Sequence, residues 1–169
     1  MDYEFLFVVD GRSMELDDTV ARLIDAFDAV VSWNRGCCRL AVSWEGASGE
    51  DAFGTLAEKL ALVAPELRVL RLDPELVDIA DIARRTGRSV PEVEQWTHRD
   101  SFDAGSFPSP EGAPGRFLVW RWAEVNEWLT PLGLGDGAAR PSRAEAAHID
   151  VSLLDQAKAA GLSVAAVIG

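Results

Sequence analysis

The sequence predicts an α+β protein in which two differently organised segments are followed by a further helix. Over residues 1–73, short β-rich runs alternate with two amphipathic helical patterns. Over residues 74–130, two helical patterns flank Gly87 and are followed by a loop, a short β-rich run and a tryptophan-rich helix. We therefore expect domains at 1–73 and 74–130, and then a linker and a helix within 131–169.

The first segment has the order strand, helix, strand, strand, helix, strand. The expected elements lie at residues 3–10, 16–28, 29–34, 37–45, 49–64 and 67–72. Arg35-Gly36 separates the two adjacent strands and is a short hairpin signal. The order resembles the ferredoxin-like βαββαβ fold, in which both helices cover one face of a four-stranded sheet. We expect the uncovered face to serve dimerisation, sensing of a ligand or docking of the rest of the chain.

The second segment begins with a predicted helix at 75–87 that ends on Gly87 in a left-handed conformation. Ser89 is then placed to cap another helix, because Glu92 follows three residues later as in a capping box. Pro91 falls in the first turn, where its missing N–H is harmless. A loop at 101–115, a β-hairpin arm at 115–121 and a helix at 122–129 complete the segment.

Three motifs in this segment occur in a recognisable order. They are DIARRTGRSVPEVEQWTHRD at 81–100, FPSP at 107–110 and GRFLVWRWAEVNEWL at 115–129. Together they resemble the winged helix-turn-helix of the MerR, excisionase and AlpA-like group, over residues 76–130 or about a third of the chain. The resemblance implies a DNA-binding transcriptional regulator whose second helix enters the major groove while the wing contacts the backbone or minor groove. It also implies that Trp96, Trp120, Trp122 and Trp128 are core residues rather than base-stacking residues.

The expected DNA contacts follow from this resemblance. At the start of the second helix only Gln95 has good base-reading chemistry. Glu92 could at most accept from a cytosine amine, and the carboxylates of Glu92 and Glu94 would otherwise be repelled by phosphates. Positive side chains around this helix would position the protein on the phosphates. The complete set of candidate DNA-binding residues is Arg84, Arg85, Arg88, Gln95, His98, Arg99, Arg116 and Arg121.

A second hypothesis is a protein-interaction adaptor, in which the same scaffold binds a protein partner. It is motivated by the acids on the second helix and by a net charge of −12, with acids outnumbering bases in all three segments. The two hypotheses differ in what the arginines do. One continuous positive face would support DNA binding, whereas arginines paired with Asp81, Glu92, Glu94 and Asp100 would support the adaptor.

Other classes find little support in the sequence. No set of residues carries a reaction, so we expect neither an enzyme nor a cofactor. The adjacent Cys37 and Cys38 point to opposite faces of a strand, and with only two histidines we expect no metal site. No apolar run reaches the roughly 18 residues of a membrane span, and the first residues lack a basic leader. We therefore expect a cytoplasmic protein without a membrane partner.

The third segment starts with a glycine- and proline-containing linker at 131–142. A helix at 142–161 follows, capped by Ser142 and ended by Gly161. Its apolar stripe either folds back on the first domain or meets its copy in a dimer. Residues 162–169 are apolar, so we expect them to be packed. A homodimer is expected in either case, because one small module buries little DNA surface.

Overall fold

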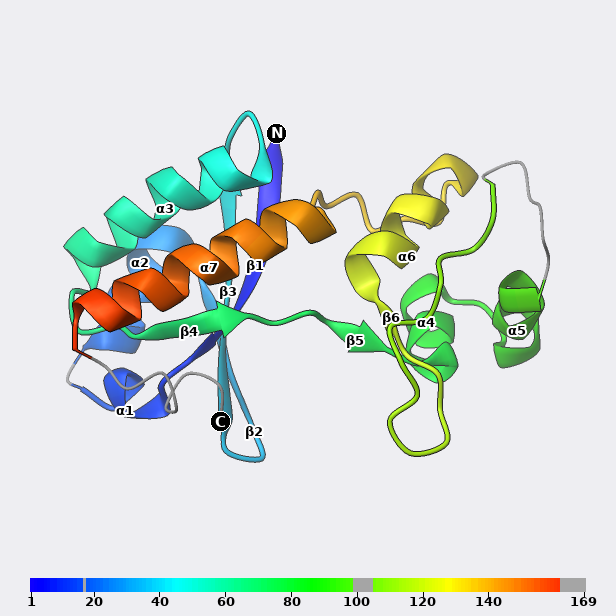
Figure 1. Ribbon diagram of the computed structural model, residues 1–169, viewed down its shortest axis with the longest axis horizontal. Coiled ribbons are helices and arrows are strands. Elements are labelled where there is room, and N and C mark those ends of the chain that lie inside the picture. The colour runs from blue at the N-terminus through cyan, green and yellow to red at the C-terminus, as the bar shows by residue number, and fades with distance from the viewer. Residues whose placement is uncertain (17, 99–104, 162–169) are drawn as a thin grey trace. The chain divides into compact units, whose positions relative to one another are not determined.

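The computed structural model describes residues 1–16, 18–98 and 105–161, and it divides the chain into two compact units (Figure 1). Unit 1 comprises Met1–Asp73 together with Ala139–Gly169, and unit 2 comprises Pro74–Ala138. The chain is a mixed α+β protein with an antiparallel sheet. Unit 2 thus continues to Ala138, beyond the boundary expected near residue 130, and the last helix belongs to unit 1.

The sheet of unit 1 has the strand order β2-β3-β1-β4 with every neighbouring pair antiparallel. Its strands are β1 (Asp2–Val9), β2 (Val30–Asn34), β3 (Cys37–Glu45) and β4 (Val69–Leu72). Arg35 (φ 48°) and Gly36 (φ 82°) form the β2–β3 connection. Two successive positive φ angles are typical of the type I′ turn, whose twist matches that of a hairpin. The hairpin expected at Arg35-Gly36 is confirmed.

Four helices of unit 1 lie within the described residues. They are α1 (Gly11–Met14), α2 (Thr19–Phe27), α3 (Gly49–Val63) and α7 (Arg143–Ala159). The short α1 was not expected, and it forms because the Asp10 side chain accepts a hydrogen bond from the Arg12 N–H. The helix expected from residue 16 consequently begins at Thr19. Ser142 caps α7, as expected, and the structure shows that the cap is a full capping box with Glu145.

The core of unit 1 lies between one face of the sheet and the helices. Phe5 and Phe7 of β1 stack with ring centroids 5.7 Å apart, and Phe53 of α3 packs against both. Ile149 and Leu153 of α7 join the same core, and α7 lies beside α3 and β4 (Figure 1). Of the two alternatives for the last helix, α7 therefore folds back onto the first domain.

Unit 2 contains two two-residue strands and three α-helices among its described residues. The elements are β5 (Leu76–Val77), α4 (Ile79–Thr86), α5 (Val90–His98), β6 (Trp120–Arg121), α6 (Trp122–Leu129) and the 3₁₀ helix η1 (Thr130–Leu132). Their core joins Val77, Ile82, Val93, Val125 and Leu129 to three buried tryptophans.

Two expectations for unit 2 are corrected by the structure. The helix predicted from residue 75 begins only at Ile79, because Asp78 caps it in a capping box with Asp81 and Leu76–Val77 pairs with β6. The arm predicted at 115–121 is strand only at Trp120–Arg121, and this strand pairs with β5. A single antiparallel bridge between Gly112 and Val119 closes the loop before it.

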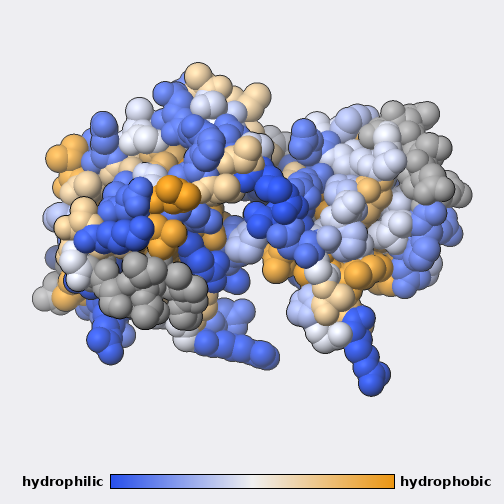
Figure 2. Space-filling view, viewed as in Figure 1, coloured by the Kyte–Doolittle hydropathy of each residue, from blue (hydrophilic) through white to orange (hydrophobic). Residues whose placement is uncertain are grey.

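The surface of the face shown in Figure 2 is mostly hydrophilic, with apolar residues in small patches over both units. No helix within the described ranges is long and apolar enough to span a bilayer.

Candidate nucleic-acid interface

The two helices α4 and α5 are joined by a turn at Gly87. Gly87 has φ 67° and caps α4 in the left-handed conformation, and the Arg88 N–H donates to the Ala83 carbonyl at 3.0 Å. α4 thus ends at Thr86, and α5 begins at Val90 after three intervening residues. The left-handed cap expected at Gly87 is confirmed.

The start of α5 is fixed by Ser89 and Glu92. The Ser89 N–H and hydroxyl both donate to Glu92 Oε2, at 2.9 and 2.7 Å. These hydrogen bonds lower the pKa of Glu92, with a smaller contribution from the Arg88 guanidinium. Glu92 is therefore an ionised capping residue, and its carboxylate is already engaged.

The remaining side chains of α5 divide into two faces. Val93 is buried and Trp96 packs against the core of unit 2, whereas Val90, Pro91, Glu94, Gln95 and His98 are exposed. His98 Nδ1 lies 2.7 Å from the Glu94 carbonyl oxygen, so the ring is tied to the end of its own helix. Gln95, the expected base reader, lies on the exposed face.

Most of the candidate arginines make ion pairs with carboxylates. The distances are 2.5 Å for Arg84–Asp81, 3.0 Å for Arg85–Glu75, 3.9 Å for Arg88–Glu92 and 3.0 Å for Arg121–Glu111. Arg85 also lies over the ring of Trp122, 4.6 Å from its centroid. Of the acid partners that would support the adaptor, Asp81 and Glu92 are thus paired with arginines, and the surface is not the one continuous positive face that would support DNA binding.

Glu75 and Glu111 are partners that the sequence did not indicate. Glu75 precedes β5 and Glu111 precedes the Gly112–Val119 bridge, so the pairing of β5 with β6 and the bridge bring them to Arg85 and Arg121. Asp81 and Glu92 were foreseeable because they lie three and four residues from Arg84 and Arg88 on helical turns.

Arg116 differs from the other candidates. It lies in a loop that is closed by two backbone hydrogen bonds. The Glu111 N–H donates to the Val119 carbonyl at 2.8 Å, and the Val119 N–H donates to the Gly112 carbonyl at 2.9 Å. Arg116 is exposed and makes no ion pair within the part of the chain that the structure describes. The neighbouring Phe117 and Leu118 are 70% and 46% exposed. We call residues 112–119 the wing loop; its tip carries one positive and two apolar side chains. Arg99 lies outside the described residues.

The tryptophans of unit 2 are structural. Trp120, Trp122 and Trp128 are buried, and their indole N–H groups donate to Pro108 O, Asp136 Oδ2 and Gly105 O at 3.0 to 3.1 Å. Trp96 packs on Trp128 with ring centroids 5.7 Å apart. Buried rings with satisfied N–H groups are core residues, and they are not available to stack on bases.

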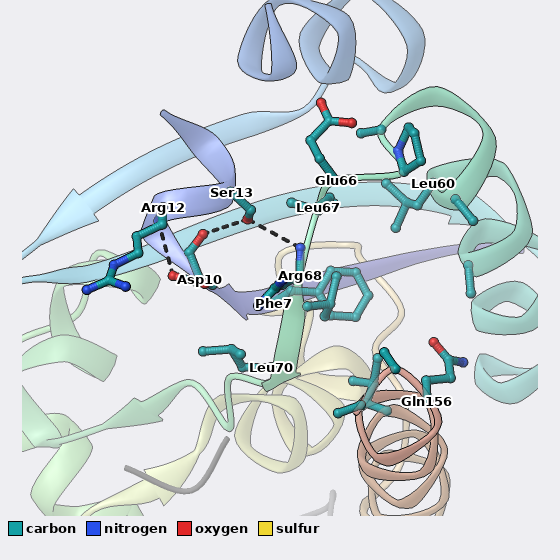
Figure 3. A pocket seen from close by; sticks show the side chains of 18 of the residues that line it. Phe7, Asp10, Arg12, Ser13, Leu60, Glu66, Leu67, Arg68, Leu70 and Gln156 are labelled. Atoms are coloured by element: carbon teal, nitrogen blue, oxygen red, sulfur yellow. Dashed lines mark hydrogen bonds between the residues drawn. The ribbon is translucent and has the colours of Figure 1, made fainter. Parts of the chain in front are cut away.

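Unit 1 contains a cavity of about 780 Å³ next to α1, the end of α3 and the end of α7 (Figure 3). Its walls are mainly apolar and include Phe7, Leu60 and Leu67. The polar groups at one side are engaged with one another, since the Ser13 hydroxyl donates to Asp10 O and accepts from Arg68 N–H. Arg12 points away from the cavity in this view.

Glu66 at the rim of this cavity faces α2. It accepts hydrogen bonds from the Thr19 hydroxyl and from Arg22, and these bonds, that of Thr19 foremost, lower its pKa. Its role is therefore to tie the loop after α3 to α2.

Metal ligands do not converge anywhere in the described parts of either unit. Cys38 is buried, and its pKa is raised by that burial and by the neighbouring Cys37, so it is a poor thiolate. Comparison with known proteins assigns no relationship: no family model matches the chain, and neither a curated protein nor a solved structure gives a significant match.

Proposed function

We propose that the protein is a DNA-binding transcriptional regulator in which unit 2 is a winged helix-turn-helix. The observation that supports this most is the combination of α4, the Gly87 turn and α5 with a closed wing loop that exposes Arg116. In this proposal the exposed face of α5 enters the major groove and the wing loop contacts the phosphate backbone or minor groove. The order of strands in unit 1 supports a ferredoxin-like domain that serves dimerisation or sensing.

The ion pairs of the arginines count against this proposal, but their strength is small. Ion pairs between exposed side chains typically contribute about 0–1 kcal/mol to stability. Breaking such a pair so that the arginine can contact a phosphate therefore costs little. The pair of Arg84 is solvent exposed, and that of Arg88 is 3.9 Å long. These two arginines can therefore exchange partners on DNA. Arg85 is held more firmly, since it also contacts Trp122.

Base reading is expected to be weak. Only Gln95 and His98 offer side-chain hydrogen bonds on the exposed face of α5 without repelling phosphate. The affinity should therefore come mainly from phosphate contacts, and the discrimination between sequences should be modest.

The adaptor remains the second candidate, because the exposed face of α5 carries two carboxylates and four arginines of the interface are paired. In this case a protein partner with a basic surface would cover Glu94 on the exposed face of α5.

Titration of the full chain into labelled genomic DNA fragments, followed by fluorescence anisotropy, tests the DNA proposal. We expect dissociation constants below about 1 μM at low salt, with a steep loss of affinity as salt is raised. Absence of binding at about 50–100 mM salt contradicts the proposal, because phosphate contacts are strongest there.

Glu94→Lys separates the two candidates. Glu94 makes no ion pair within the described residues, so the change adds charge without removing a cap. DNA binding should strengthen several-fold because a repulsive carboxylate becomes a phosphate ligand, whereas an adaptor should lose its partner. Glu58→Lys on α3 of unit 1 is the matched control, since it makes the same change in charge on an exposed helix.

A further inference from the structure

The two edge strands of the sheet in unit 1 differ in what covers them. The edge formed by β4 is covered by α7, and the Leu72 N–H donates to Asp150 Oδ1 of that helix at 2.8 Å. The other edge is β2, which pairs with β3 on one side and with no other strand among the described residues (Figure 1). Unpaired strand edges are normally protected by charges, prolines or a covering element.

Within the part of the chain that the structure describes, β2 carries none of these protections. Its sequence is VVSWN, without a charge or a proline, in a chain in which 26% of residues are charged. Val30 is 64% exposed and Trp33 is 53% exposed. An uncharged and apolar edge of this kind pairs readily with another strand.

Trp33 is also held in place. A Cβ atom on Gly11 would lie 2.7 Å from Trp33 Cζ3, so the indole packs directly on the backbone of α1. An exposed aromatic ring that is already ordered loses little conformational entropy when a partner covers it.

We propose that β2 is a dimerisation edge, on which β2 of a second copy of this chain pairs antiparallel across a twofold axis. The pairing joins two four-stranded sheets into one. The inference concerns unit 1 alone and does not depend on the proposed function of unit 2.

The sequence of β2 is self-complementary when the axis passes through Ser32. Val31 then lies opposite Trp33 of the second copy, and the contact occurs twice by symmetry. Cross-strand pairs of a β-branched and an aromatic residue are among the stabilising ones. This register keeps each residue opposite one that points to the same face of the sheet, as antiparallel pairing requires.

The charges that flank β2 are complementary in this register. Arg35 of one copy comes beside Ala29 and close to Asp28 of the second copy. Both Arg35 and Asp28 are exposed, and neither makes an ion pair within the described residues. An acid at one end and a base at the other favour the antiparallel over the parallel arrangement.

The interface is small, so the dimer should dissociate at micromolar concentrations. Sedimentation of the full chain between about 1 and 500 μM, a span chosen for an interface of this class, should show a reversible monomer–dimer equilibrium.

Trp33→Lys should raise the dissociation constant at least tenfold, since it places a charge in the edge. Leu62→Lys, at a 79% exposed position on α3, is the matched control and should leave the constant unchanged. A protein that is monomeric throughout, or a Trp33→Lys variant that associates like the wild type, overturns the proposal.

A covalent test covers the case in which Trp33→Lys perturbs folding. Residues facing each other in an antiparallel pair have Cα atoms about 4.5 or 5.5 Å apart, and both distances suit a disulfide. In a Cys37→Ser background, which leaves only the buried Cys38, Ser32→Cys should form disulfide-linked dimers on mild oxidation. Ser43→Cys, exposed on the same face of β3, should not. Equal cross-linking of both variants, or of neither, contradicts the proposed edge.

Discussion

At the scale of single residues, the start of α5 shows how an acid can be structural within a candidate interface. Glu92 accepts two hydrogen bonds from Ser89, and its pKa is lowered in consequence. A carboxyl with a lowered pKa in the folded state contributes stability above its unfolded pKa. This contribution is lost as the pH falls through the folded pKa.

Ser89→Ala should therefore raise the pKa of Glu92 toward its ordinary value, because the hydroxyl donor is removed while the N–H donor remains. An NMR titration of the side-chain carboxyl carbon measures the shift. An unaltered titration of Glu92 would show that the Ser89 hydroxyl is not its donor.

Trp122 is the residue on which two interactions of unit 2 converge. Its indole N–H donates to Asp136 and its ring carries the Arg85 guanidinium. Trp122→Phe should destabilise the protein by about 1–3 kcal/mol, because a buried hydrogen bond is lost and a gap is left. Urea unfolding measures the change. Trp33→Phe on an exposed strand should cost much less, and equal losses would contradict the assigned role of Trp122.

At the residue scale, the left-handed cap at Gly87 is predicted from the glycine that follows the helical pattern. The burial of Trp120, Trp122 and Trp128 agrees with the core positions that the resemblance implies. The pairs of Arg84 and Arg88 were the alternative to phosphate contact, and they are foreseeable because their acids lie three and four residues away. The roles of Glu75 and Glu111 depend on strand pairing between distant residues, which spacing alone does not indicate.

At the scale of elements, the turn between α4 and α5 depends on the positive φ of Gly87. A Cβ atom there meets nothing within 4 Å, so any cost of substitution comes from the backbone conformation. Gly87→Ala should destabilise unit 2 by about 1–2 kcal/mol, the cost of a left-handed alanine.

Gly54→Ala is the control for this prediction. Gly54 lies inside α3 with equally open space around a Cβ atom, so alanine should stabilise the protein by up to about 1 kcal/mol. Thermal unfolding should therefore move in opposite directions for the two variants. A shift in the same direction would mean that the Gly87 turn is not under conformational constraint.

The sequence predicted element bounds well where one periodic pattern is unbroken. The strand at 37–45 and the helix at 122–129 have their expected bounds for this reason. The sequence predicts helix for residues 75–78 as well, since Val77 fits the apolar period of the pattern that follows. Their pairing with β6 is a tertiary contact that overrides this local preference.

At the scale of the whole molecule, α7 belongs to unit 1, although the residues of unit 2 separate it in sequence from the rest of that unit. Ile149 is 2% exposed in the core of unit 1, and Glu145 accepts a hydrogen bond from the Gly49 N–H at 2.7 Å. This arrangement was one of two alternatives in the sequence, because an apolar stripe does not specify what it covers.

Ile149→Ala should accordingly destabilise unit 1 by about 2–4 kcal/mol, the usual range for truncating a buried isoleucine. Hydrogen exchange followed by mass spectrometry should show faster exchange in β1, β3 and β4, with unchanged rates in α4 and α6. Val151→Ala, at a 56% exposed position of the same helix, should change neither the stability of unit 1 nor these exchange rates. Accelerated exchange in unit 2 as well would show that the two units unfold together.

The central claim is that unit 2 binds DNA through phosphate contacts, and the salt dependence of its affinity tests this most directly. Arg116 on the wing loop is exposed and makes no ion pair within the described residues, so Arg116→Ala should remove one phosphate contact without breaking a bond in the free protein. We predict a slope of log affinity against log salt that is smaller by about one for Arg116→Ala and unchanged for the control Arg12→Ala in unit 1. Equal slopes for the wild type and both variants, or no binding at low salt, would contradict the account.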